Sequence, residues 1–257
     1  MDLMVYCKQG KDVELRMLHI FQKGFNFSQD GPGNRLVYHL QGCNLRCPWC
    51  SNPEGLARIG ATGYEINDLV AEVLRSKLMF FDGGGVTLTG GEVTMQFDAV
   101  QEFLTRLHET GIHTCIETNG ICKRLPELFP VLDLLIMDIK HYDPALHQNV
   151  TGLPNHFTIE NIAAAIRAEQ KLALRIPLIG GFNAEETDAH GFATLLTELG
   201  VAGNATVELL AYHEYGKDKY ASLGMEYTMT EQARVTKAQV QSYTEILEAA
   251  GLTVIHT

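Results

Sequence analysis

The sequence predicts an α/β fold in which helices cover a parallel β-sheet. Short, almost continuously apolar segments alternate along the chain with longer segments whose apolar residues recur at helical spacing. Continuous apolar strands are typical of parallel sheets buried on both faces, and a regular alternation of strand and helix is typical of parallel α/β folds. The pattern alone favours a (β/α) barrel and an open doubly wound sheet about equally.

The first half of the chain begins with two predicted strands and continues with helix and strand in turn. Residues 15–22 form an apolar strand, and a polar, glycine-rich connection follows through Gly33. The composition of Asp30–Gly33 predicts a turn, because glycine tolerates a positive φ and proline fixes φ. The further elements expected are a strand at 36–40, a helix at 66–80, a strand at 86–89, a helix at 97–110, a strand at 113–117, a short helix at 125–129 and a strand at 132–139.

The second half continues this alternation. The elements expected are a helix at 161–169, a strand at 172–178, a helix at 185–199, a strand at 206–211, a long helix at 230–250 and a strand at 253–255. Residues 22–34 and 141–156 are expected to be polar loops. The 257 residues are long enough for one large core, so a single domain (1–257) is predicted. There is no second cysteine-rich segment in the sequence, so no additional ferredoxin-like cluster domain is expected.

The composition indicates a cytoplasmic protein. No run of about 18 apolar residues occurs, and residues 1–11 lack an apolar stretch of signal-peptide length, so no membrane association is predicted. The formal net charge of −11 argues against a nucleic-acid partner, because such binding depends on neutralising phosphates. The six cysteines are too few and too clustered for a secreted disulfide framework.

Three of these cysteines lie in the loop that leaves the predicted strand 36–40. Cys43, Cys47 and Cys50 have the spacing C-x₃-C-x₂-C, and no fourth cysteine follows nearby. Thiolates are the ligands of iron–sulfur clusters, and three of them hold a [4Fe–4S] cluster that keeps one iron open to an outside ligand. A structural zinc site needs four ligands, so zinc, the alternative, would require a distant fourth partner.

The spacing, with Trp49 just before the last cysteine, resembles the signature of the radical S-adenosylmethionine (SAM) enzymes. More narrowly, residues 30–35 and 51–54 resemble those of the activating enzymes of glycyl radical enzymes. The resemblance covers most of the chain, since it continues through Gly90–Glu92, Glu117–Gly120, Asp138–Lys140 and Tyr212–Glu214.

This resemblance implies a partial (β/α)6 barrel of the TIM-like, radical SAM type, whose active site lies at the C-terminal ends of the strands. Cys43, Cys47 and Cys50 would bind the [4Fe–4S] cluster and carry the catalysis. The amino and carboxylate groups of SAM would bind the open iron. The residues expected to contact the cluster or SAM are Trp49, Gly90, Gly91, Glu92, Lys140, Arg175 and His213.

Several of these residues also have structural interpretations. The Glu92 carboxylate suits an ammonium group, and Lys140 and Arg175 suit a carboxylate or ribose. However, Gly90–Glu92 could be a simple turn after a strand, and Trp49 could belong to the core. Basic residues at strand ends are also common solvent-facing groups, so Arg175 could either contact SAM or face the solvent.

The family further implies a monovalent cation, Na⁺ or K⁺, beside SAM. By position its ligands would be Glu117, Thr118, the carbonyl of Ile136, and Asp138. The pyruvate formate-lyase activases have aspartate where this chain has Glu117, so the extra methylene moves the carboxylate at this position.

The function implied is that of a radical SAM oxidoreductase of anaerobic metabolism. It would use the cluster to cleave SAM reductively and would abstract a glycine Cα hydrogen from a partner glycyl radical enzyme, the pyruvate formate-lyase type being favoured. A flavodoxin or ferredoxin would donate the electron, and the chain is expected to be a monomer. The alternatives are a radical SAM enzyme that acts on a small molecule and a non-catalytic zinc-binding module.

Overall fold

The computed structural model describes residues 17–57 and 60–255, and these residues form two compact units. The first unit contains the chain up to Asn44, Glu54–Thr118 and Cys122–Ile136, and the second contains Leu45–Pro53, Asn119–Ile121 and the chain from Met137 onward. The cysteine loop therefore contributes Cys43 to the first unit and Cys47 and Cys50 to the second. The expectation of a single domain stays a prediction.

The first unit is built on a sheet with the strand order β3-β1-β2-β4-β5. β1 pairs antiparallel with β2 and with β3, whereas β2 pairs with β4 and β4 with β5 in parallel. β2, β4 and β5 are almost wholly buried, including the threonines that alternate with apolar residues in β4. The strand bounds are β1 Met17–Phe27, β2 Asn34–Leu40, β3 Thr62–Glu65, β4 Gly85–Gly90 and β5 Thr114–Thr118.

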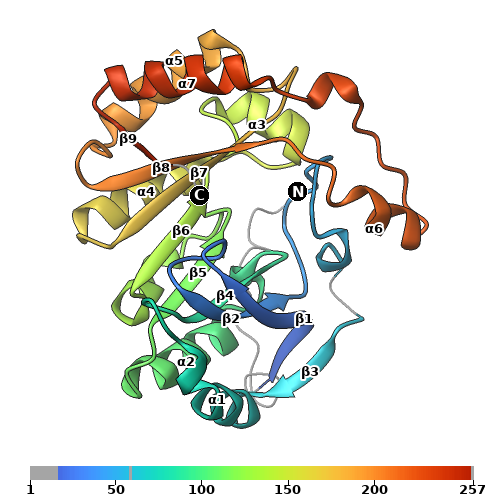
Figure 1. Ribbon diagram of the computed structural model, residues 1–257, viewed down its shortest axis with the longest axis vertical. Helices are drawn as coiled ribbons and strands as arrows, with labels where there is room; N and C mark the ends of the chain where they lie inside the picture. Colours follow the sequence, from blue (N-terminus) through green and yellow to red (C-terminus); the bar gives the residue numbers. More distant parts are fainter. Residues whose placement is uncertain (1–16, 58–59, 256–257) are drawn as a thin grey trace. The chain divides into compact units, whose positions relative to one another are not determined.

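Two α-helices of the first unit, α1 (Ile66–Arg75) and α2 (Phe97–Glu109), lie side by side (Figure 1). Each buries one apolar face, and in α1 that face consists of Ile66, Leu69, Val70 and Val73. The unit also contains three 3₁₀ turns, η4 (Lys77–Met79), η5 (Val93–Gln96) and η6 (Leu125–Val131).

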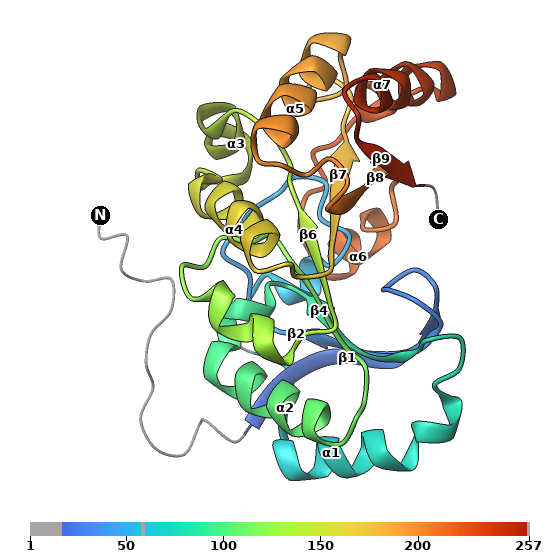
Figure 2. The same cartoon turned by 90° about the vertical axis from the view of Figure 1, so that its left-hand side faces the viewer.

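The second unit contains a parallel set of strands, β7 (Leu172–Leu178), β8 (Ala205–Ala211) and β9 (Thr253–Ile255). Helices α5 (Glu186–Glu198) and α7 (Lys237–Ala249) lie side by side in both views (Figures 1 and 2). Both helices begin with a capping box, in which the side chains of the N-cap and the third helical residue satisfy each other's backbone N–H groups.

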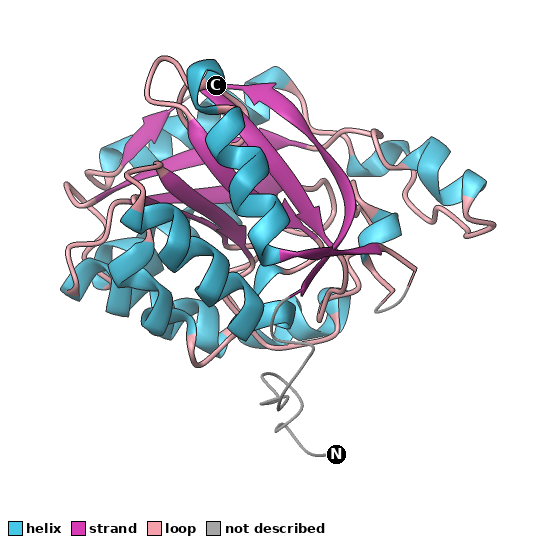
Figure 3. Cartoon of the chain, turned by 90° about the horizontal axis from the view of Figure 1, so that it is seen from below, coloured by secondary structure: helices cyan, strands magenta, loops and turns pink. Residues whose placement is uncertain are grey.

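The other elements are β6 (Leu134–Asp138), whose residues belong to both units, α3 (Pro144–Thr151), α4 (His156–Arg167), α6 (Lys217–Ser222), η3 (Pro53–Gly55) and η7 (Glu231–Ala233). Helical segments separate most successive strands of the chain, as the colours of Figure 3 make visible. The predicted α/β class with a mostly parallel sheet is therefore confirmed.

Some predicted boundaries are wrong. Residues 22–34 are not all loop, because β1 continues to Phe27, where it still pairs with β2. This half of β1 is exposed, including Phe25 and Phe27, so it has no buried apolar pattern to reveal it. The loop expected at 141–156 contains α3, which begins where the Asp143 carboxylate accepts hydrogen bonds from two backbone N–H groups.

Two predicted helices are also too long, and two short elements escaped prediction. α1 ends at Arg75 and is followed by the 3₁₀ turn η4, so the helix expected at 66–80 is divided. The long helix expected at 230–250 begins only at Lys237, where Thr236 provides the cap. β3 and α6 carry few buried apolar side chains, which explains why periodicity did not predict them. Residues 15 and 16 of the first predicted strand lie outside the described residues.

Candidate active site

In the first unit, the glycines after β4 bring its end against the backbone that leads into the cysteine loop. The Gly42 carbonyl oxygen accepts a hydrogen bond from the Glu92 amide at 2.7 Å, and the Gly42 amide donates to the Gly55 carbonyl at 2.8 Å. A Cβ at Gly91 would lie 2.2 Å from the Gly42 oxygen, and Gly90 has a φ of +109°. Both glycines thus serve a backbone contact beside the cysteine loop. Their contact with SAM stays a prediction.

The Glu92 carboxylate is buried and held by three donors. Its Oε1 atom accepts hydrogen bonds from the Thr94 amide at 3.0 Å, the Thr94 hydroxyl at 2.7 Å and the Thr118 hydroxyl at 2.7 Å. Glu92 is 1% exposed, and its carboxylate caps η5. Glu92 and Thr118, which we expected at SAM and at the cation, therefore contact each other. Glu117 accepts a hydrogen bond from the Thr89 hydroxyl at 2.8 Å.

At the end of β6, Lys140 pairs with Asp138, with 2.8 Å between Nζ and Oδ2. The Lys140 side chain is 11% exposed and that of Asp138 is 37% exposed. The ammonium group neutralises a carboxylate that we expected to bind a cation. Of the other expected cation ligands, Ile136 is buried in the same strand, and it belongs to the first unit together with Glu117 and Thr118.

The second half of the cysteine loop forms a tight turn, in which the Cys50 amide donates to the Cys47 carbonyl at 3.2 Å. None of Cys43, Cys47 and Cys50 forms a disulfide bond. Burial raises the pKa of the Cys47 thiol to about 12, although the charge of Lys140 lowers it in part. A buried thiol of this kind is protonated at neutral pH and would release its proton on binding a metal, which favours the thiolate.

Two contacts with the rest of the second unit hold this half of the loop. The Arg46 amide donates to the carbonyl of Thr151 at the end of α3, at 2.8 Å. The ring centroids of Trp49 and Phe182 lie 5.2 Å apart, and those of Phe182 and His141 lie 5.0 Å apart. Trp49 is thus part of an aromatic core group, and its contact with a cluster stays a prediction.

The segment around His213 packs against the same half of the loop. A Cβ at Gly216 would lie 2.3 Å from the Cys50 carbonyl oxygen, and Lys219 Nζ donates to Asn52 Oδ1 at 3.0 Å. The His213 ring stacks on Tyr215, with 4.0 Å between the ring centroids. Burial lowers the pKa of His213, so the imidazole is neutral at neutral pH.

Sequence reasoning missed Glu208, the partner of Arg175. The two residues are opposite each other in the parallel register of β7 and β8, and Arg175 Nε donates to Glu208 Oε2 at 2.7 Å. Their side chains are 12% and 6% exposed, so the pair is buried. A single carboxylate within the apolar strand 205–211 was the signal that could have revealed it. Arg175 is therefore a paired residue of the unit's interior and not a solvent-facing group.

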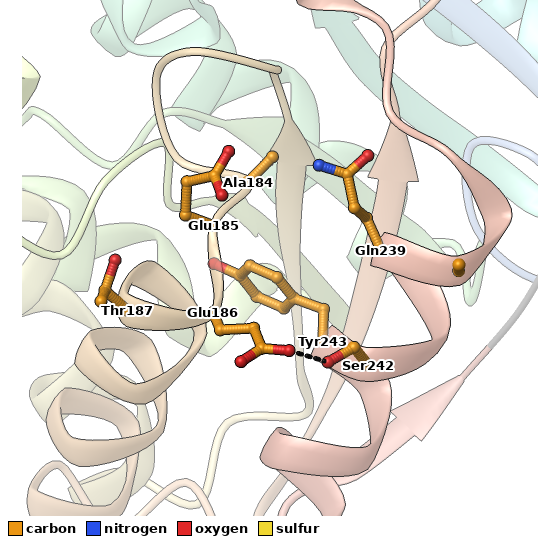
Figure 4. A pocket seen from close by; sticks show the side chains of 8 residues that line it. Ala184, Glu185, Glu186, Thr187, Gln239, Ser242 and Tyr243 are labelled. Carbon is orange, nitrogen blue, oxygen red and sulfur yellow. Dashed lines mark hydrogen bonds between the residues drawn. The ribbon is translucent and has the colours of Figure 1, made fainter.

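A hollow elsewhere in the second unit lies between the start of α5 and the start of α7 (Figure 4). Glu186 and Ser242, which line it, are joined by a hydrogen bond of 3.0 Å. None of the eight residues that line this hollow is a predicted site residue.

Comparison with known proteins gives the class of this chain. The Radical SAM superfamily matches residues 37–192, which include the three clustered cysteines and the motifs up to Arg175. The chain belongs to the radical SAM superfamily. It is also similar to a radical SAM methyltransferase from Sphaerobacter thermophilus, with 20% identity, a TM-score of 0.65 and coverage of 90% of this chain and 67% of that one. This likeness concerns the fold alone, and it agrees with a partial (β/α)6 barrel.

More similar relatives narrow the family. The chain is 33% identical to the pyruvate formate-lyase 1-activating enzyme of Escherichia coli (strain K12) over 86% of this chain and 92% of the relative. It is 30% identical to the choline trimethylamine-lyase activating enzyme of Oleidesulfovibrio alaskensis over 82% and 89%. A domain of pyruvate-formate lyase-activating enzyme from Bacteroides vulgatus shares 26% identity at a TM-score of 0.54, over 67% of this chain and 98% of that domain. Within the superfamily, the chain belongs to the activating enzymes of glycyl radical enzymes.

Proposed function

We propose that this enzyme holds a [4Fe–4S] cluster through Cys43, Cys47 and Cys50 and uses it to activate a partner glycyl radical enzyme. The observation that carries the proposal is the set of three cysteines in one loop, none of them in a disulfide and two of them in a tight turn. Three thiolates fit a cluster with one open iron, and they do not complete a four-ligand zinc site. The number and type of these side chains therefore suit the cluster that the family implies, although no three His, Cys, Asp or Glu side chains of the described residues are already gathered as a metal site.

Charged residues named in the sequence analysis would bind SAM. Glu92 would accept the ammonium of its methionine part beside Gly90 and Gly91, and Lys140 would face its carboxylate. Arg175, oriented by Glu208, would add a second cation for the carboxylate or the ribose hydroxyls. The neutral ring of His213 and the indole of Trp49 would pack near the adenine or the cluster.

A bound cluster would supply the electron that cleaves SAM into methionine and a 5′-deoxyadenosyl radical. The chain would orient SAM for the reaction, exclude water from the site and admit the glycine loop of the partner. Abstraction of a hydrogen atom from the glycine Cα would leave the unpaired electron on the partner and would convert the 5′-deoxyadenosyl radical into 5′-deoxyadenosine. We favour a partner of the pyruvate formate-lyase type over the choline trimethylamine-lyase type, because the former relatives are the more similar.

Three further features complete the proposal. A monovalent cation would bind beside SAM through Glu117, Thr118, the Ile136 carbonyl and Asp138. A flavodoxin or ferredoxin would provide the electron, and the enzyme would work as a cytoplasmic monomer. Within residues 17–57 and 60–255, no helix combines the length and apolarity that crossing a bilayer requires.

Anaerobic reconstitution with iron and sulfide tests the proposal. We expect about four irons per chain and a broad visible absorbance, then 5′-deoxyadenosine from SAM after reduction with dithionite. Addition of pyruvate formate-lyase should give the doublet of a glycyl radical in electron paramagnetic resonance. A colourless protein that binds zinc instead would refute the cluster. Cleavage of SAM without a radical on either lyase type would refute the activase assignment and support a small-molecule substrate.

A further inference from the structure

The start of α6 lies unusually close to the cysteine loop. Gly216, the residue before the helix, has a φ of −77° and a ψ of −22°, which any residue adopts. A Cβ at this position would nevertheless lie 2.3 Å from the Cys50 carbonyl oxygen and 3.3 Å from the Ser51 Cα. The backbone conformation therefore does not require glycine at this position. The close approach to the loop is what excludes a larger residue.

One side chain of α6 contacts the same part of the loop. Lys219 Nζ donates to Asn52 Oδ1 at 3.0 Å, two residues beyond the last cysteine. The next residue, Tyr220, is buried, and its ring packs against that of Tyr227 with 5.1 Å between the centroids.

The spacing of these two contacts indicates a single face. Positions 216 and 219 are related as i and i+3, and such positions lie on one side of a helix. Lys217 is on a different side, with a side chain that is 58% exposed. The loop itself has little regular structure to hold it, since η3 begins only at Pro53. Its geometry therefore depends on neighbouring elements such as α6.

We propose that Gly216 and Lys219 are positioning residues that hold the Cys47–Cys50 turn in the geometry a cluster requires. This inference rests on the proposed function, because it needs a cluster bound by the loop. Neighbours that fix the orientation of metal ligands also determine how tightly the metal is held.

The test compares reconstituted chains that carry Gly216→Ala, Lys219→Ala or Lys219→Arg. The matched control is Lys217→Ala, which removes a lysine from the exposed side of the same helix. We expect Gly216→Ala and Lys219→Ala to release iron to a chelator about 10-fold faster than the unchanged chain. Lys219→Arg should recover part of the retention, because it can still donate to Asn52.

The outcomes separate this inference from the proposed function. If the unchanged chain takes up no iron, the proposed cluster is wrong and the inference falls with it. If the unchanged chain and every variant release iron at the same rate, the cluster stands and the role of α6 is refuted. Thermal unfolding of the cluster-free chains controls for folding. If Gly216→Ala is unstable, Lys219→Ala decides the question, because the Lys219 side chain is only partly buried.

Discussion

Arg35 carries a fully buried guanidinium group, and its replacement tests what the segment 30–35 does. It is 0% exposed, and its Nε and Nη2 atoms each donate at 2.6 Å, to the Thr87 hydroxyl and to the Val86 carbonyl. A third donor, Nη1, contacts the Pro32 carbonyl at 3.2 Å. Burial lowers the pKa of Arg35, and nearby anionic groups oppose that shift. These contacts join the turn 30–33 to β2 and β4.

Arg35→Met keeps an apolar stem of similar length and removes every donor. The two short charged hydrogen bonds are worth about 1.5–3 kcal/mol each, so we expect the free energy of unfolding to fall by about 3–6 kcal/mol. Urea unfolding of the cluster-free chain, followed by circular dichroism, measures this loss. Arg167→Met is the matched control, because Arg167 is exposed at the end of α4. Equal midpoints for the two variants would refute the structural reading and would make the segment a candidate for SAM or partner contact.

Four further predictions concern the site and its surroundings. Cys47→Ala should abolish iron binding and SAM cleavage together, since two thiolates cannot hold the cluster; retained iron would contradict the ligand assignment. Glu117→Asp should keep activity and give a SAM affinity that depends on sodium or potassium; indifference to both ions in both forms would refute the cation site. Glu208→Ala should lower the free energy of unfolding by about 3–5 kcal/mol, because it removes the carboxylate that compensates the buried Arg175. Glu208→Gln should lower it less. Equal stability of the unchanged chain and both variants would contradict this prediction. Burial lowers the pKa of His147 from 6.5 to about 4, so the folded chain binds fewer protons than the unfolded chain between these values. The resulting stability is present above pH 6.5 and is lost as the pH falls toward 4. It amounts to at most about 3.4 kcal/mol, which is about 2.5 pKa units at 1.36 kcal/mol each. His147→Gln should flatten this dependence in urea unfolding.

The sequence predicted the buried elements of the fold well, for a physical reason. The strands at 172–178 and 253–255 have the predicted bounds, and the helix expected at 185–199 differs by one residue at each end. Continuous apolar segments and capping residues leave a direct trace in the sequence. The exposed half of β1 leaves none, since it is held by backbone pairing with β2 and not by a buried face.

The candidate site was predictable in its residue types and not in its pairings. The cysteine spacing and the polar residues at strand ends follow from local sequence. That Arg175 pairs with Glu208, 33 positions later in the chain, depends on the register of two parallel strands, which no local pattern specifies. The contact of Gly216 with Cys50 is likewise tertiary, and only the glycine itself hints at it.

The two acidic groups expected closest to SAM differ in how readily they could change partners. Glu92 is 1% exposed and accepts three hydrogen bonds through one oxygen atom, so moving it would break a buried network at the cap of η5. Asp138 is 37% exposed, whereas the side chain of its partner Lys140 is only 11% exposed, so separating the pair would leave a largely buried ammonium group without its counter-charge. Glu92 is therefore suited to be a fixed acceptor, already oriented before a ligand arrives. The proposed contact of Lys140 with the SAM carboxylate would require that carboxylate to replace Asp138 as the counter-charge, and Asp138 would then become available to a cation.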